Sequence, residues 1–129
     1  MIVVDTSALM AIVLNEPEAD AVAAALEQAD GIAMSAATVA EALIVARRRG
    51  AGDVMSRLID GLGAQIAPVS RDVAAEVADA YDRWGKGVHA AGLNFGDCFA
   101  YALARRLGAP LLYVGRDFTL TDVSRAGAR

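Results

Sequence analysis

Short apolar runs that alternate with helical segments constrain this chain more than any other feature of its sequence. Four runs of mainly aliphatic residues qualify: 1–5 ("MIVVD"), 31–35 ("GIAMS"), 64–70 ("AQIAPVS") and 109–115 ("APLLYVG"). Each is separated from the next by segments whose apolar residues recur at helical spacing. Parallel strands need helical crossovers and are buried on both faces, so we expect a three-layer α/β/α fold with a short, mostly parallel central sheet.

The helical segments carry recognisable start and stop signals. They are expected at 8–15, 16–30, 36–50, 53–63, 71–85 and 94–108. Thr6 or Ser7 can cap the first, Pro17 suits the first turn of the second, and Ser35 is a natural N-cap for the third. Segments 86–96 and 116–123 are expected to be loops, the second leading to a possible edge strand. The terminal segment 124–129 is expected to be loosely held.

The size and composition of the chain limit the classes to which it can belong. Its 129 residues suit a single domain over 1–129, with a core built from small aliphatic residues because aromatics make up only 5%. No apolar run reaches the roughly 18 residues that span a bilayer, and Met1 leads into a strand without a basic signal segment. We therefore expect a cytoplasmic protein without a membrane partner.

Charge and cysteine content narrow the chemistry further. The net charge of −4 gives no global positive field for nucleic acid. The basic clusters at 47–49 and 105–106 end predicted helices, where cations complement the helix dipole. Cys98 is the single cysteine, which excludes an internal disulfide, and its helical setting suggests a packed apolar residue rather than a reactive thiol.

Four of the sixteen acidic residues do not fit the polar faces of amphipathic helices. Asp5 directly follows the first apolar strand. Glu41 lies within 36–46, where every other residue except Thr38 is apolar. Asp97 begins the apolar helix, and Asp117 follows the fourth strand. An unpaired carboxylate in such surroundings is costly, so each of these acids needs a reason.

The positions of these acids suggest a common site. Parallel α/β sheets bind ligands at the carboxyl ends of their strands, where Asp5 and Asp117 belong and where the first turn of the Asp97 helix points. Glu41 reaches this edge only if its helix leans over it. Four carboxylates in one place require compensation, and Mg²⁺, or alternatively Mn²⁺, prefers such oxygen ligands. This set would suit phosphodiester hydrolysis by a metal-activated water.

The chain resembles the PIN domain, and within it the VapC-type ribonuclease toxins of type II toxin–antitoxin pairs. The resemblance lies in "MIVVDTSALMAIVLNEPEA", "MSAATVAEA" and "GLNFGDCFAYALARRLGAPLLYVGRDFTLTD", which occur in order over essentially the whole chain. It implies a parallel sheet with flanking helices and a Mg²⁺-dependent endoribonuclease.

The resemblance also implies roles for individual residues. Asp5 and Asp97 would be the principal metal ligands, Glu41 would complete the acidic pocket and help position or deprotonate the water, and Asp117 would be the fourth acid. Asp122 is the alternative to Asp117 as the fourth acid, although the sequence around it is also typical of a structural turn.

Three polar neighbours of the acids have two interpretations each. Thr6 or Ser7 would hydrogen-bond a ligand carboxylate or the scissile phosphate, or would cap the following helix. Asn94 would contact RNA or fix its loop. Lone His89 suits a surface position in a glycine-containing loop.

The family further implies a homodimer and a cognate antitoxin whose tail wraps a hydrophobic groove and blocks the acidic site. The helices at 19–26 and 54–62 offer apolar residues for such a groove, but core packing explains them equally well. Residues 47–49, Lys86 and Arg116 are candidates for contacts with the RNA backbone.

Other classes fit the sequence less well. A receiver domain would have an acidic pair before its first helix and a lysine after its last strand, whereas Asp5 stands alone and Gly115 and Arg116 follow strand four. A haloacid-dehalogenase-like phosphatase would have a second Asp where Ser7 stands. A catalytically inactive PIN-like binding module is the remaining alternative, although a carboxylate pocket without chemistry would cost stability.

Overall fold

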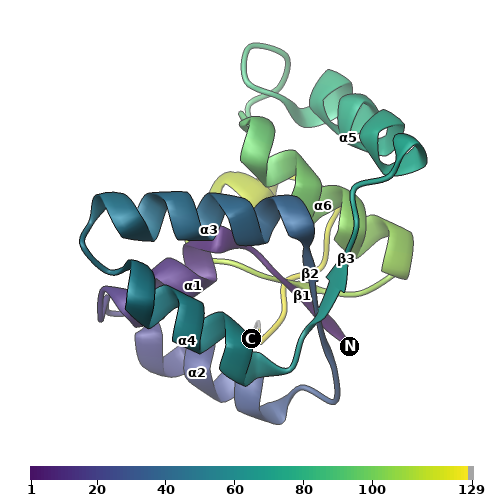
Figure 1. Cartoon of the computed structure of the whole chain (residues 1–129). Coiled ribbons are helices and arrows are strands. Elements are labelled where there is room, and N and C mark those ends of the chain that lie inside the picture. The colour runs from purple at the N-terminus through teal and green to yellow at the C-terminus, as the bar shows by residue number, and fades with distance from the viewer. Residues whose placement is uncertain (128–129) are drawn as a thin grey trace.

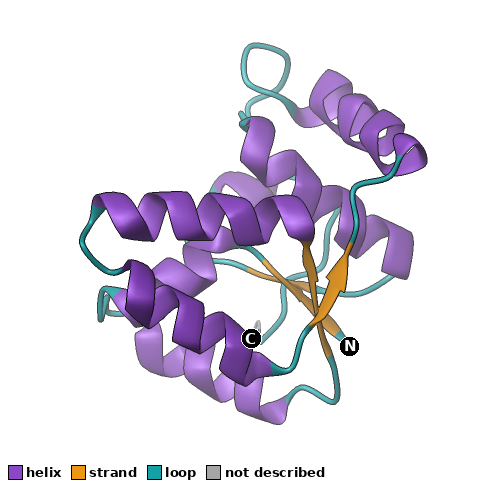
Figure 2. Ribbon diagram, in the orientation of Figure 1, coloured by secondary structure: helices purple, strands orange, loops and turns teal. Residues whose placement is uncertain are grey.

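The computed structural model of the chain describes residues 1–127. Its strands are β1 (Ile2–Val4), β2 (Ile32–Ser35), β3 (Gln65–Ala67) and β4 (Leu111–Leu112). Its helices are α1 (Thr6–Val13), α2 (Ala19–Gln28), α3 (Ala36–Arg48), α4 (Gly52–Leu62), α5 (Arg71–Trp84) and α6 (Phe95–Leu107), and a 3-10 helix, η1, spans Asp117–Leu120. Figures 1 and 2 show the strands crossing the centre of the molecule between two groups of helices.

The four strands form one sheet in the order β3-β2-β1-β4, and every pairing within it is parallel. Val3 of β1 is in register with Ala33 on one side and Leu111 on the other. The predicted α/β class with a short parallel sheet is therefore confirmed. Within residues 1–127, the possible last edge strand is reduced to an isolated parallel bridge between Leu111 and Arg125.

Alternate strand residues enter two separate hydrophobic cores, one on each face of the sheet. Val3, Ala33 and Leu111 pack with residues of α5 and α6, while their neighbours Val4, Met34 and Leu112 pack with residues of α1, α2, α3 and α4. This alternation follows from the period of two along a strand. It produces the three layers that the sequence predicts.

Helix α3 crosses from one core to the other. Its first turn packs through Ala37 against the core that contains α6, whereas Ala42 and Ala46 belong to the core that contains α1 and α4. The helix therefore leans over the carboxyl edge of the sheet between α1 and α6, which it contacts on either side (Figure 1). This tilt carries Glu41 toward that edge.

Two expectations about helix starts are wrong. Helix α1 is capped by Asp5, not by Thr6 or Ser7, because the extended backbone of Asp5 lets its carboxylate accept the Ser7 N–H. Helix α2 begins at Ala19, so Pro17 precedes it in a turn. Ser35 caps α3 as expected, by accepting the Ala37 N–H.

The expectation of a loosely held terminus is wrong for residues 124–127. The Ser124 carbonyl accepts the Leu111 N–H at 2.8 Å, and the Ala126 N–H donates to the Leu111 carbonyl at 2.9 Å. Ala126 is buried, and the guanidinium of Arg125 lies over the Tyr113 ring at 4.4 Å from its centroid. These contacts bind the segment to the exposed edge of β4. Residues 128–129 of the same expectation lie outside the described residues.

Candidate functional site

Asp5 sits at the junction between β1 and α1, and 3% of its surface is exposed. Its Oδ2 accepts the Ser7 N–H at 3.0 Å and the Ser7 hydroxyl at 2.6 Å. The Ser7 oxygen in turn accepts the Val114 N–H at 3.0 Å, which ties the end of β4 to the same place. The other carboxylate oxygen, Oδ1, is buried without a hydrogen-bond partner.

Burial raises the pKa of Asp5, and the negative charge of Glu41 raises it further, while the hydrogen bonds from Ser7 oppose the shift. A buried carboxylate with one orphaned oxygen is costly unless something compensates it. The orphaned oxygen therefore suggests a ligand at this position.

Glu41 is held beside Asp5 by residues from two other helices. The Thr6 hydroxyl donates a hydrogen bond of 2.6 Å to Glu41 Oε1. On the other side, the carboxylate lies against the backbone of Gly96 in the first turn of α6: a Cβ placed at Gly96 would be 2.1 Å from Glu41 Oε2. The helix tilt that the sequence left open therefore brings Glu41 to the edge where Asp5 and α6 meet.

Asp97 is the third residue of α6 and forms a capping box with Asn94. The Asp97 N–H donates to Asn94 Oδ1 at 2.8 Å, and the Asn94 N–H donates to Asp97 Oδ2 at 3.0 Å. This arrangement favours the loop-fixing interpretation of Asn94.

Capping alone does not explain the electrostatics of Asp97. Burial raises the pKa of Asp97 to about 7; the hydrogen bond from Asn94 opposes the shift, and the charges of Asp5, Glu41 and Asp117 add to it. Asp97 therefore lies within reach of the fields of all three other candidate acids.

Asp117 and Asp122 have different surroundings. Asp117 is the exposed first residue of η1, and its charge acts on Asp97. Asp122 instead accepts a hydrogen bond from the Tyr101 hydroxyl and forms ion pairs with Arg83 at 3.5 Å and Arg105 at 3.8 Å. This difference favours Asp117 as the fourth acid and places Asp122 in a structural network.

Burial, local hydrogen bonding or a position at a helix end explains several other polar or reactive side chains without a role in the site. Cys98 is fully buried, and burial raises the pKa of its thiol to about 11. His89 is exposed, as expected, and its Nδ1 accepts the Ala91 N–H at 2.9 Å. Arg105 and Arg106 lie in the last turn of α6, as do Arg47 and Arg48 in α3.

The apolar residues of α2 and α4 are used mainly in the core. Val22, Leu26 and Met55 are buried, and Leu58 and Ile59 pack against the same cluster. Val54 is 47% exposed, so α4 still presents apolar surface.

The donor set of the acid cluster fits a hard divalent cation, although it is not preassembled. Within residues 1–127, no group of three or more His, Cys, Asp or Glu side chains is arranged to hold a metal ion as it stands. Asp5 Oδ2 and Glu41 Oε1 already accept hydrogen bonds from the Ser7 and Thr6 hydroxyls. Asp5 Oδ1 has no partner, and all four acids offer only oxygen, which is the donor that Mg²⁺ and Mn²⁺ prefer.

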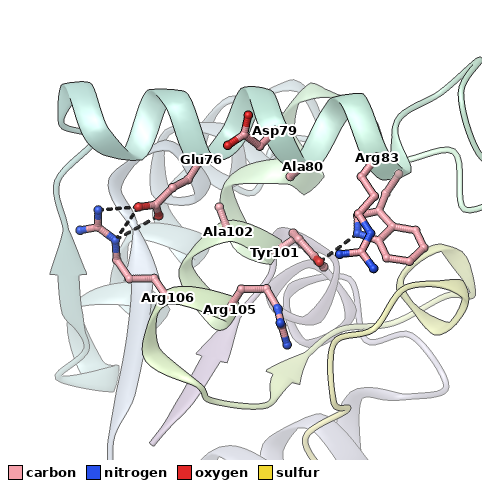
Figure 3. Close-up of a pocket in the computed structure, with 9 residues that line it drawn as sticks. Glu76, Asp79, Ala80, Arg83, Tyr101, Ala102, Arg105 and Arg106 are labelled. Carbon is pink, nitrogen blue, oxygen red and sulfur yellow. Dashed lines mark hydrogen bonds and ion pairs between the residues drawn. The ribbon is translucent and has the colours of Figure 1, made fainter.

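The hollow between α5 and α6 offers a different environment. It has a volume of about 330 Å³, and Figure 3 shows Glu76, Asp79, Arg83, Arg105 and Arg106 around it. Glu76 pairs with Arg106 at 2.7 Å, and Asp122 pairs with the other two arginines. Each of the three arginines thus has a carboxylate partner, so the hollow offers an anion no unpaired arginine.

One element of the cluster was not singled out from the sequence. Gly96 falls in both the predicted loop 86–96 and the predicted helix 94–108, and the structure places it in the first turn of α6, against Glu41. A glycine inside a predicted helix, where it costs stability relative to alanine, is the signal that could have identified it.

Among the residues that the structure describes, no helix combines the length and the apolar character that crossing a membrane requires.

Comparisons with known proteins agree with this architecture. The PIN domain family model matches residues 2–123. Ribonuclease VapC36 of Mycobacterium tuberculosis is 46% identical over 129 residues, covering 97% of this chain and 93% of that protein. Ribonuclease VapC of Mycolicibacterium smegmatis is 43% identical, covering 95% and 97%.

Solved structures share the fold at lower sequence identity. The crystal structure of Mycobacterium tuberculosis VapC20, described as a sarcin–ricin loop cleaving toxin, superposes with a TM-score of 0.81 at 15% identity and covers 98% of both chains. A toxin–antitoxin complex from Klebsiella pneumoniae gives a TM-score of 0.72 at 18% identity, covering 99% of this chain and 98% of that one. The family-model match and the identity to the VapC relatives show that this chain belongs to the PIN domain family and, within it, to the VapC group.

Proposed function

We propose that this protein is a Mg²⁺-dependent endoribonuclease and the toxin of a toxin–antitoxin pair. The observations that support this proposal are the charges of Asp5, Glu41 and Asp117, which all act on Asp97, and the buried oxygen of Asp5 that has no hydrogen-bond partner. The name that the relatives share, ribonuclease VapC, supports the reaction class.

Asp5 and Asp97 would be the principal ligands of the ion, with Glu41 and Asp117 completing its acidic surroundings. Mn²⁺ would serve in place of Mg²⁺ because both ions prefer oxygen donors. When bound, the ion would supply charge stabilisation at the phosphate and lower the pKa of an attacking water.

The residues of the chain would then have separate roles. Asp5, fixed by the Ser7 hydroxyl, presents its free oxygen to the site. Glu41, fixed by the Thr6 hydroxyl, would orient the water and accept its proton as the water oxygen bonds to phosphorus and the phosphodiester P–O bond breaks, and the leaving oxygen would take a proton from solvent. Asp97 is rigidly placed by its capping box, so ligand geometry is maintained by the start of α6.

RNA binding would depend on local cations because the chain as a whole is acidic. Arg116 is exposed and directly precedes Asp117, so it is placed to contact the RNA backbone next to the acids. Lys86 and residues 47–49 would extend that contact. Cleavage should therefore weaken as salt rises.

The proposed partners are RNA as substrate, a cognate antitoxin and a second copy of the chain in a homodimer. The structural neighbour from Klebsiella pneumoniae is a toxin–antitoxin complex, which supports an antitoxin partner. The cytoplasm, where RNA is available, is the proposed location.

The test is cleavage of a mixed-sequence RNA by the purified protein in Mg²⁺, with EDTA as the metal-free control. We expect fragments in Mg²⁺ and none in EDTA. Cleavage that persists in EDTA would contradict the metal-dependent mechanism. A protein that binds its partner but leaves RNA intact in Mg²⁺ and Mn²⁺ would be the catalytically inactive PIN-like binding module instead.

A further inference from the structure

We propose that Gly96 is a positioning residue for Glu41: its missing side chain creates the space in which the Glu41 carboxylate lies. This inference rests on the proposed function, because it matters for activity only if Glu41 belongs to the reacting site.

The geometry leaves no room for any side chain at position 96. A Cβ there would lie 2.1 Å from Glu41 Oε2, 2.6 Å from its carboxylate carbon and 2.8 Å from Oε1. All three distances are below van der Waals contact, so the Glu41 carboxylate occupies the space that a Cβ at position 96 would need. A methyl group at this position and the present location of the Glu41 carboxylate exclude one another.

The backbone gives no other reason for a glycine at this position. Gly96 is not among the glycines with positive φ, and it lies inside α6, where glycine is less favourable than alanine by about 0.5–1 kcal/mol. The three nearest atoms to its Cβ position all belong to Glu41. The contact with Glu41 is therefore the feature that a larger residue would disturb.

Glu41 is held between this contact and the Thr6 hydroxyl. Thr6 donates to Oε1 at 2.6 Å from the start of α1, and Gly96 limits the carboxylate from the start of α6. Because the obstructing atoms are the end of a flexible side chain, α6 need not shift when a methyl group is added. The carboxylate would swing away instead, and the fold would persist while the site loses an acid.

The experiment compares Gly96→Ala with Gly61→Ala. Gly61 is also a helical glycine with φ outside the positive range, but nothing lies within 4 Å of its Cβ position. Both substitutions should leave the melting temperature without metal unchanged or slightly higher, because alanine favours helix. Only Gly96→Ala should lower kcat for RNA cleavage, by about tenfold or more, and reduce the rise in melting temperature that Mg²⁺ produces.

A compensating variant connects the effect to Glu41. In a Glu41→Asp background the side chain is one methylene shorter and already withdrawn from Gly96, so adding Gly96→Ala should change kcat and the Mg²⁺-induced shift by less than about twofold. Similar losses from Gly96→Ala in both backgrounds would overturn the inference.

Two further outcomes would also overturn it. One is a Gly96→Ala protein that cleaves RNA and responds to Mg²⁺ like the parent. The other is a large fall in melting temperature without metal, which would mean that Gly96 acts through packing. If the parent itself neither cleaves RNA nor gains stability from Mg²⁺, the proposed function fails, and the inference fails with it for that separate reason.

Discussion

Two clusters of charged side chains in this molecule both contain aspartate and glutamate, but only one of them also contains arginines that pair with its acids. At the carboxyl edge of the sheet, burial and then the charges of Asp5, Glu41 and Asp117 raise the pKa of Asp97, and no cation is paired with these four acids in residues 1–127. At the hollow between α5 and α6, Glu76 pairs with Arg106 (Figure 3), and Asp122, which follows η1, pairs with Arg83 and Arg105.

The second cluster is also satisfied in its hydrogen bonds. The Trp84 indole N–H donates to the Tyr101 hydroxyl at 2.9 Å, and that hydroxyl donates to Asp122. In the first cluster, a buried oxygen of Asp5 remains unpaired. The comparison teaches that uncompensated charge, rather than the mere presence of acids in a hollow, distinguishes the candidate functional site of this fold.

The largest difference between the two clusters should appear in activity. We expect Asp97→Asn to lower RNA cleavage by at least about a hundredfold, because a proposed metal ligand loses its charge while its capping geometry is kept. Asp122→Asn is the matched control and should stay within a few-fold of the parent. Initial cleavage rates in Mg²⁺ measure both. Equal losses in the two variants would erase the functional distinction between the clusters.

The two clusters should also respond oppositely to pH and metal. The raised pKa of Asp97 means that the folded state binds its proton more tightly than the unfolded state does, so stability without metal should fall as pH rises from about 4 to about 7. Asp97→Asn should remove this loss and be more stable than the parent by roughly 1–3 kcal/mol at pH 8 without metal.

Denaturant unfolding at pH 5 and pH 8, with and without Mg²⁺, tests this prediction. Mg²⁺ should stabilise the parent at pH 8 and have little effect on Asp97→Asn. An equal Mg²⁺ effect in both proteins would show that the ion binds elsewhere.

In the compensated cluster, the same kind of substitution should reduce stability. Asp122→Ala removes the acceptor of the Tyr101 hydroxyl and leaves two arginines without their carboxylate, so we expect a loss of about 1–2 kcal/mol. The loss should not depend on Mg²⁺. Thermal unfolding measures it, and a gain in stability would show that Asp122 is as uncompensated as the acids of the site.

The smallest effect should come from the exposed pair of Glu76 and Arg106. Their bidentate contact is solvent-exposed, so Arg106→Ala should produce only a slight fall in melting temperature, and the difference should disappear in high salt. A large, salt-independent fall would mean that Arg106 stabilises the fold through its packing between α5 and α6.

Much of the architecture could be predicted because it depends on local patterns. The apolar runs at Ile2–Val4 and Ile32–Ser35 alternate with helical segments, and this alternation predicts a parallel sheet covered on both faces. The starts of elements were harder to predict. Asp5 became the cap of α1, since its carboxylate reaches the Ser7 N–H, and Thr6 was thereby free to bond Glu41.

The candidate acids could be predicted because each is out of place in its own segment. Asp5 ends an apolar strand, and Glu41 interrupts an apolar helix. Gly96 was missed because its importance is a contact with a residue 55 positions away, and no local pattern records that contact. The choice between Asp117 and Asp122 likewise depended on which partner each meets in space.

The sequence by itself therefore determined the layers, the parallel order of strand and helix, and the acids that lack a local explanation, because periodicity and burial cost are properties of a segment. Only the tertiary structure decided that α3 leans between α1 and α6, that Thr6 and Gly96 enclose Glu41, and that arginines neutralise Asp122. The physical reason is that hydrogen bonding, steric exclusion and Coulomb interaction depend on distances in space, which the packing of the two cores sets.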